Sequence, residues 1–189
     1  MSVIDKVIAA VTPVASDEQR AEARARAFAA ADPGDWLSLI LDHHVELEEA
    51  LMAVEEAVDL EERNDAFKEF AILLTGHAIA EEGVIYPALS MDASAGHADK
   101  GYSEQAVVKL QMAALERLDP LSEEFEDKLE EVKTALQQHM YEEEGDWFVD
   151  LRLKATAEDQ ATLTARYAEE FDRYVGDAGP LVDEEEDED

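Results

Sequence analysis

Three segments of this sequence repeat one spacing of potential metal ligands, a histidine followed four and five residues later by glutamates. The repeated sets are His44, Glu48 and Glu49; His77, Glu81 and Glu82; and His139, Glu143 and Glu144. In an α-helix, residues i and i+4 lie one turn apart on the same face. The imidazole and the first carboxylate can therefore bind one metal ion, or two neighbouring ions with the carboxylate bridging them. Three occurrences among five histidines have a chance probability on the order of one in ten thousand.

Each repeat also falls on the apolar face of its segment. The apolar neighbours at helical spacing are Ile40 and Leu47 for His44, Phe70 and Leu74 for His77, and Val132 and Leu136 for His139. A single His-x-x-x-Glu pair is usually a surface ion pair, but a buried carboxylate without a partner is costly. Several such pairs turned inward need a cation or a complete hydrogen-bond network. We interpret them as a metal site, with a purely structural polar core as the alternative.

The elements that must position these residues are predicted to be four long helices. Apolar residues at steps of three and four indicate helices over residues 36–62, 64–87, 102–118 and 123–154, with a loop over residues 91–101. Asp35 and Ser122 are the expected N-caps of the first and the fourth helix. Short connections between long helices predict an all-α, up-down-up-down four-helix bundle.

Further segments flank this bundle. Residues 1–34 are expected to form an N-terminal helical arm, with one short helix over residues 3–11 and a second one capped by Ser16. The bundle itself takes residues 35–155. A C-terminal helix capped by Thr156 fills residues 156–176, and residues 177–189 form an acidic tail with almost nothing to bury, which is expected to be disordered.

The amino-acid composition limits the partners and the metal donors that this protein can use. The chain carries 48 acidic against 15 basic residues, a formal net charge of −33, and this charge disfavours nucleic acid and anionic membranes as partners but attracts cations. Cysteine is absent, so a metal site would use imidazole and carboxylate donors. The sequence has no long apolar run and does not start like a signal peptide, and we expect a cytoplasmic protein.

At the repeats, the sequence resembles the hemerythrin-like family, the HHE cation-binding domain. The resemblance covers about residues 36–154 and rests on Asp42-His43-His44, on HAIAEEGVIYPAL from His77 and on HMYEEEGDWF from His139. It implies two iron ions bound by terminal histidines and bridged by Glu81 and Glu143. The donor types themselves suit iron, manganese or zinc.

The third helix departs from the family pattern. Glu104-Gln105 stands where the family has Glu-His, so Gln105 offers a weaker, neutral oxygen donor in place of an imidazole nitrogen. Glu48, one turn from His44, is a candidate to supply a carboxylate from the first helix. The predicted ligand set is therefore His44, Glu48, His77, Glu81, Gln105, His139 and Glu143.

Several residues near the repeats have two possible roles. His43 and His44 compete for one ligand position, and the helical phase favours His44. Glu49, Glu82 and Glu144 lie one residue off the apolar face, so they are either solvated or accept hydrogen bonds from ligand imidazoles. Core packing is expected for Tyr86, Tyr141 and Trp147, with hydrogen bonding to a bound small molecule as the alternative. His97 is predicted to be an exposed loop residue.

Three functions agree with these features. The first is a di-iron protein that binds or senses O2, peroxide or NO. The second is a di-iron enzyme with oxidase or peroxide-decomposing activity, and the sequence leaves open whether the protein is an enzyme. The third is a stress-related iron-holding or interaction protein, although the sequence identifies no protein partner.

Overall fold

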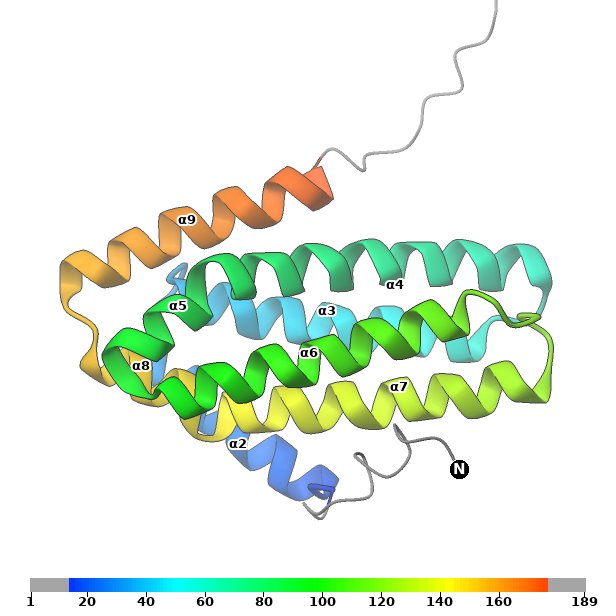
Figure 1. Ribbon diagram of the computed structural model, residues 1–189, viewed down its shortest axis with the longest axis horizontal. Coiled ribbons are helices and arrows are strands. Elements are labelled where there is room, and N and C mark those ends of the chain that lie inside the picture. The colour runs from blue at the N-terminus through cyan, green and yellow to red at the C-terminus, as the bar shows by residue number, and fades with distance from the viewer. Residues whose placement is uncertain (1–13, 177–189) are drawn as a thin grey trace, which may run out of the picture.

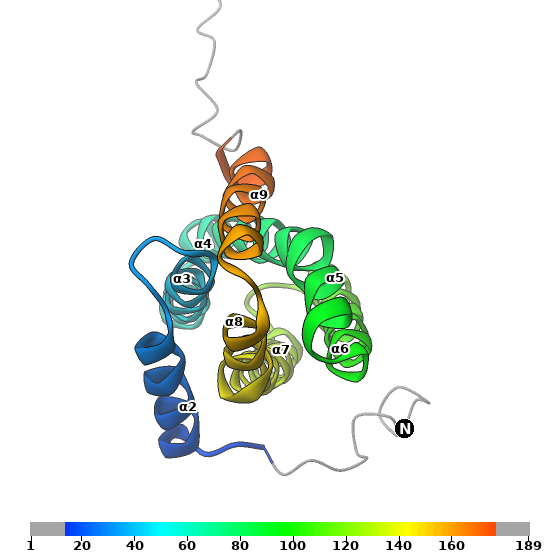
Figure 2. The same cartoon turned by 90° about the vertical axis from the view of Figure 1, so that its left-hand side faces the viewer.

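The computed structural model describes residues 14–176, and the regular elements in that range are all helical (Figure 1). Four long helices lie side by side in alternating directions (Figures 1 and 2). They are α3 (Trp36–Glu56), α4 (Leu60–Ala80), α6 (Ala95–Leu115) and α7 (Glu123–Glu142). The predicted all-α four-helix bundle is confirmed. The helix expected over residues 3–11 and the acidic tail expected over residues 177–189 lie outside the described residues.

Shorter elements join and flank the bundle. After α4 the chain continues through η1 (Glu81–Ile85), α5 (Tyr86–Ala88) and η2 (Leu89–Ala93), and after α7 through η3 (Glu143–Trp147) and α8 (Phe148–Lys154). The η segments are turns of π-helix. Outside the bundle, α2 (Asp17–Ala30) packs against α3 and η3, and α9 (Ala157–Val175) packs across α3 and α4 (Figure 2).

The predicted N-caps are confirmed. The side chains of Ser16, Asp35, Ser122 and Thr156 each accept a hydrogen bond from the backbone amide three residues later. Each bond satisfies one amide that the first turn of a helix leaves without a partner. Local sequence thus sets the start of α2, α3, α7 and α9.

The predicted end of the first helix is wrong. Helix α3 stops at Glu56 rather than residue 62, and Val58, expected on the inward face, is 85% exposed. The cause is Asp59, whose carboxylate accepts from the amide of Glu62 and starts α4 at Leu60, four residues before the predicted start at residue 64.

The predicted loop over residues 91–101 and the predicted end of the second helix near Pro87 are also wrong. Helical structure continues to Ala93, and α6 begins at Ala95 because Ser94 caps it through the amide of His97. Pro87 is tolerated because it follows the π turn η1, where hydrogen bonds have already left the α-helical register and its missing N–H costs little.

The apolar core is divided into two clusters. One gathers around Trp36, Phe148 and Tyr167 at the end of the bundle where α8 and α9 attach. The other fills the opposite half around Phe70 and Phe125. The buried residues of the repeats, His44, His77, Glu81, His139 and Glu143, lie near the boundary between the two clusters, so apolar residues flank them on both sides. No described helix combines the length and the hydropathy that a bilayer crossing requires.

Gly76 of α4 lies where the last turn of α9 packs closely against that helix. A Cβ atom at this position would lie 2.6 Å from Cγ2 of Val175 and 3.4 Å from Cβ of Tyr174. Only a residue without a side chain fits there while α9 keeps its position.

We expect Gly76→Val to lower the free energy of unfolding by about 1–3 kcal/mol, because the added atoms overlap the last turn of α9. The control is Gly96→Val, since the nearest atom to a Cβ at Gly96 is the Ser94 hydroxyl at 3.8 Å. Urea denaturation followed by circular dichroism measures both variants. Equal stabilities would contradict the tight docking of α9.

Candidate metal centre

Histidine and glutamate side chains from three segments of the bundle meet between the two apolar clusters. His44 comes from α3, His77 and Glu81 from the junction of α4 and η1, and His139 and Glu143 from the junction of α7 and η3. All five are buried. His44, His77, Glu81 and Glu143 each offer one ligand atom, and these atoms lie within 4.8 Å of one another. We refer to the five residues as the metal centre.

Each carboxylate of the metal centre stands between two imidazoles. Oε2 of Glu81 is 3.3 Å from Nε2 of His77, and its Oε1 is 3.9 Å from Nε2 of His44. Oε1 of Glu143 is 3.3 Å from Nε2 of His139, and its Oε2 is 3.5 Å from Nε2 of His44. Both carboxylates therefore direct their two oxygens toward different nitrogens, which is how a bridging carboxylate must be placed.

Several of these buried donor atoms have no hydrogen-bond partner within the described part of the chain. They are Nε2 of His44, Nε2 of His77, Oε1 of Glu81 and Oε2 of Glu143. Leaving a buried polar atom unpaired costs about 1–3 kcal/mol, and more for a charged group. Each of the four residues whose ligand atoms lie close together, His44, His77, Glu81 and Glu143, has one such unpaired atom. The site therefore fits one or more cations.

Burial also dominates the acid–base properties of the centre. Desolvation raises the pKa of Glu81 and of Glu143 well above the usual carboxyl range, and it lowers the pKa of His44 and of His77 well below the usual imidazole range. Burial opposes the charged form of His139 as well, but the carboxylates of Glu143 and Glu104 outweigh it and raise the pKa of that imidazole. A cation would restore the charged carboxylates and favour the neutral imidazoles that ligate metals.

Tyr86 and Gln105 fill the side of the centre next to α6, a helix that contributes no histidine to the centre. The Tyr86 hydroxyl donates to Oε1 of Glu143 at 2.7 Å and lies 3.1 Å from Nε2 of His139. The amide of Gln105 donates to Oε2 of Glu81 at 2.6 Å and to the Tyr86 hydroxyl at 2.8 Å. Gly101 makes room for this ring, because a Cβ there would lie 2.8 Å from Cζ of Tyr86.

The second and the third repeat share a local irregularity that the first lacks. A π turn begins at Glu81 and another at Glu143, whereas α3 continues as regular helix past Glu48. A π turn changes the direction of the side chains that follow, and such turns are frequent at functional sites. Here it precedes Tyr86 in one copy and ends at Trp147 in the other, and both aromatic residues are buried.

A second layer of side chains holds the outward Nδ1 atoms of the three ligand imidazoles. Nδ1 of His44 is 2.8 Å from Oε1 of Glu144, Nδ1 of His77 is 3.2 Å from the hydroxyl of Tyr167, and Nδ1 of His139 is 3.0 Å from Oε2 of Glu104. A partner on Nδ1 leaves Nε2 free to face the centre and fixes the ring orientation. Arg24 of α2 donates in turn to Glu144 at 2.9 Å, so α2 supports His44 through Glu144, whereas α9 supports His77 directly.

The remaining candidate residues from the sequence lie outside the metal centre. Glu48 does not join the metal centre, since it is half-buried and forms an ion pair with Arg24. His43 also faces away: its ring stacks on Phe171, with centroids 3.6 Å apart, and its Nδ1 is 2.8 Å from the Tyr167 hydroxyl. Of the glutamates next to the apolar face, Glu144 binds a ligand imidazole, Glu82 pairs with Lys109 and Glu49 is exposed.

The prediction for His97 is wrong. It lies on α6, is half-buried, and stacks on Trp147 with ring centroids 5.4 Å apart, because Ser94 starts the helix earlier than expected. The sequence reasoning also missed Arg24, Glu104 and Tyr167. In the sequence, Arg24 and Tyr167 are polar residues on helices outside the bundle, and Glu104 is the residue before Gln105. Nothing in the spacing of these three residues links them to the repeats.

Comparison with known proteins agrees with this geometry. The profile described as "Hemerythrin HHE cation binding domain" matches residues 35–151. A solved hemerythrin HHE cation-binding domain-containing protein from Mycobacterium kansasii superposes with a TM-score of 0.66 and 30% identity, over 74% of this chain and 86% of that one.

A protein described as a DNA nickase, from Nostoc sp., is 30% identical over 98 residues, which are 52% of this chain and 27% of that protein. The chain thus spans about a quarter of that relative. The match to the family profile covers most of the chain and contains all five residues of the metal centre. This chain belongs to the hemerythrin HHE cation-binding domain family.

Proposed function

We propose that the metal centre holds two iron ions and that the protein binds, senses or reacts with a small oxidant such as O2, peroxide or NO. One observation carries the proposal: Glu81 and Glu143 each direct two oxygens toward different imidazoles, with His44 facing both carboxylates. A single ion would not need two carboxylates in bridging positions. Iron is supported by the mixture of imidazole and carboxylate donors, a set that manganese and zinc also accept.

The residues in and around the metal centre have different expected roles. His44, His77 and His139 supply nitrogen donors, and Glu81 and Glu143 supply bridging oxygens. Tyr86 and Gln105 stand where the family has an imidazole and donate hydrogen bonds to Glu143 and Glu81, which leaves this side of the centre less strongly ligated. Bound iron supplies redox chemistry and a coordination position for a small molecule. The Tyr86 hydroxyl holds a proton against Oε1 of Glu143, and the apolar clusters keep bulk water away.

DNA cleavage is not proposed for this chain. The relative described as a DNA nickase is much longer, and the formal net charge of −33 opposes approach to a phosphate backbone. Turnover of peroxide by purified, iron-loaded protein would distinguish an enzyme from a binding protein.

The first prediction concerns metal content. Purified protein should contain about two iron ions per chain, and His77→Ala or Glu143→Ala should lower both iron content and melting temperature, because metal binding and folding are linked. His97→Ala is the control, since that ring stacks on Trp147 outside the metal centre. Elemental analysis and thermal denaturation measure the effects. Full iron content in both ligand variants would refute the assignment.

A second prediction concerns Tyr86. Its hydroxyl donates to Oε1 of Glu143, and burial raises the pKa of this hydroxyl well above its usual range, so it keeps its proton. We expect Tyr86→Phe to weaken iron binding by about 10-fold, because Glu143 loses the donor that orients it. Tyr102→Phe should leave the affinity unchanged, because Tyr102 contacts the Tyr86 ring but donates its own hydroxyl to the backbone oxygen of Glu82. Competition with a chelator measures both variants, and equal affinities would show that the Tyr86 hydroxyl does not support the centre.

A third prediction concerns the second layer. Tyr167→Phe keeps the packed ring but removes the hydroxyl that faces Nδ1 of His77, and it should weaken iron binding by about 10–100-fold. Tyr174→Phe on the same helix is the control, since Tyr174 is exposed. Competition with a chelator measures iron affinity in both. A Tyr167→Phe affinity equal to that of the control would show that α9 only covers the bundle.

A further inference from the structure

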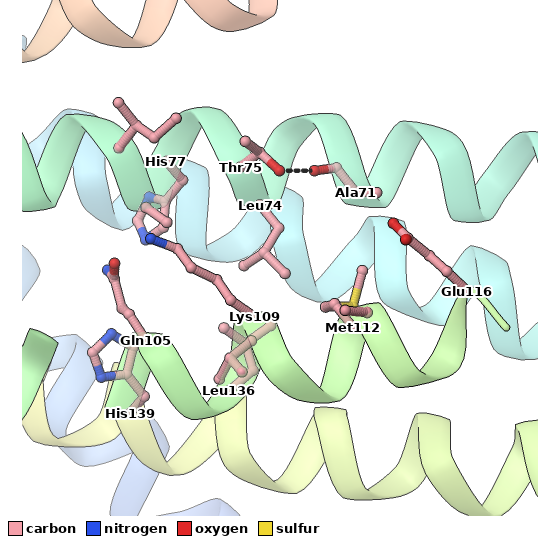
Figure 3. Close-up of a pocket in the computed structure, with 14 residues that line it drawn as sticks. Ala71, Leu74, Thr75, His77, Gln105, Lys109, Met112, Glu116, Leu136 and His139 are labelled. Carbon is pink, nitrogen blue, oxygen red and sulfur yellow. Dashed lines mark hydrogen bonds between the residues drawn. The ribbon is translucent and has the colours of Figure 1, made fainter. Parts of the chain in front are cut away.

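A cavity of about 240 Å³ runs between α4 and α6 and reaches the metal centre at its inner end (Figure 3). His77, Gln105 and His139 line that inner end, and Figure 3 shows them together at one end of the set of lining side chains. Thr75, Lys109 and Glu116 also line the cavity and are exposed, so they mark its mouth. The cavity therefore connects the molecular surface to two ligand histidines.

The wall between the mouth and the centre is hydrocarbon. Leu74, Val108, Met112 and Leu136 form it, and all four are buried. An apolar cavity of about 150 Å³ stays dry and binds benzene. At 240 Å³ this cavity is larger than that, and a diatomic molecule would fill only a small part of it. Its dimensions suit an organic molecule with an apolar body.

The inner end adds a polar requirement. Gln105 is buried and lines the cavity, its amide nitrogen donates to Glu81 and Tyr86, and its Oε1 has no partner among the described residues. An unpaired, buried carbonyl on a residue that lines an apolar cavity favours a guest that donates one hydrogen bond. A hydroxyl group meets this requirement, and a ketone or an ether does not.

The mouth selects against anions. Lys109 lines the cavity and forms an ion pair with Glu82 at 2.6 Å, which neutralises its charge, and Glu116 also lines the cavity. Figure 3 shows Lys109 and Glu116 among the lining residues. With a formal net charge of −33, the surface around the opening repels carboxylates and phosphates. Cations gain nothing from the hydrocarbon wall, which leaves neutral molecules.

We propose that this cavity binds a neutral organic hydroxyl compound of about six to ten non-hydrogen atoms, with its apolar body against Leu74 and Met112 and its hydroxyl on Gln105. This inference rests on the proposed function only in placing the bound molecule beside iron. It adds to that function the chemical class of the molecule. Binding itself needs only the cavity and Gln105.

The test uses purified full-length protein of measured iron content and three six-membered-ring probes in isothermal titration calorimetry. Cyclohexanol should bind one to one, and at least about tenfold more tightly than cyclohexanone, which lacks the donor. Cyclohexanecarboxylate should not bind measurably. Met112→Trp should abolish cyclohexanol binding by filling the cavity, whereas Leu110→Trp should retain it, since Leu110 is 61% exposed on the same helix. If Met112→Trp does not fold by circular dichroism, Ala113→Phe takes its place, because Ala113 lines the same cavity.

The possible results distinguish failure of the cavity proposal from failure of the iron-centre proposal. Absence of cyclohexanol binding to iron-loaded protein would overturn the cavity assignment and leave the iron centre standing. Equal binding by Met112→Trp and Leu110→Trp would place the probe elsewhere, and equal affinities for cyclohexanol and cyclohexanone would remove the role of Gln105; either result overturns the proposal. Protein that neither contains nor takes up iron, yet discriminates between the probes, would support the cavity and refute the proposed iron centre.

Discussion

The burial of Glu81 and Glu143 is the constraint on which the rest of this structure depends. Neither carboxylate is exposed to solvent, and desolvation raises the pKa of each well above its usual range. Their hydrogen bonds to Tyr86 and Gln105 satisfy only part of each group, and one oxygen on each remains unpaired. Cations would offset the desolvation cost of burying these two carboxylates in the bundle core. We therefore expect metal binding and folding to be coupled.

Helices outside the bundle support this arrangement. The match to the family profile spans residues 35–151, but Arg24 of α2 and Tyr167 of α9 lie beyond it and hold the two sides of the centre. Arg24 acts through Glu144 on His44, and Tyr167 acts directly on His77. Removing a hydrogen bond from a ligand histidine usually weakens metal binding even when the ligand itself is untouched. The accessory helices of this chain are therefore part of the centre as well as its cover.

The side of the centre next to α6 differs from the family pattern in linked ways. Gln105 replaces an imidazole, the hydroxyl of Tyr86 occupies the neighbouring space, and Gly101 gives the Tyr86 ring its clearance. The same side opens into the cavity between α4 and α6. A weaker donor, a tyrosine hydroxyl that donates to Glu143 and an apolar approach thus coincide on this side of the metal centre, whereas the sides next to α2 and α9 are closed by packed residues.

The sequence alone determined the helical class, four helix starts and the inward phase of His44, His77 and His139, because caps and apolar periodicity act within a few residues. It could not determine that Asp59 and Ser94 begin helices, since many polar residues compete locally for the same role. Tertiary structure decided the rest. Glu48 and Glu81 share one spacing from a histidine, yet Arg24 holds the first outside the centre while the core encloses the second. Contacts of Tyr167, 90 residues from His77, and of Arg24, 120 residues from Glu144, depend on how the accessory helices pack against the bundle, and no local pattern records that packing.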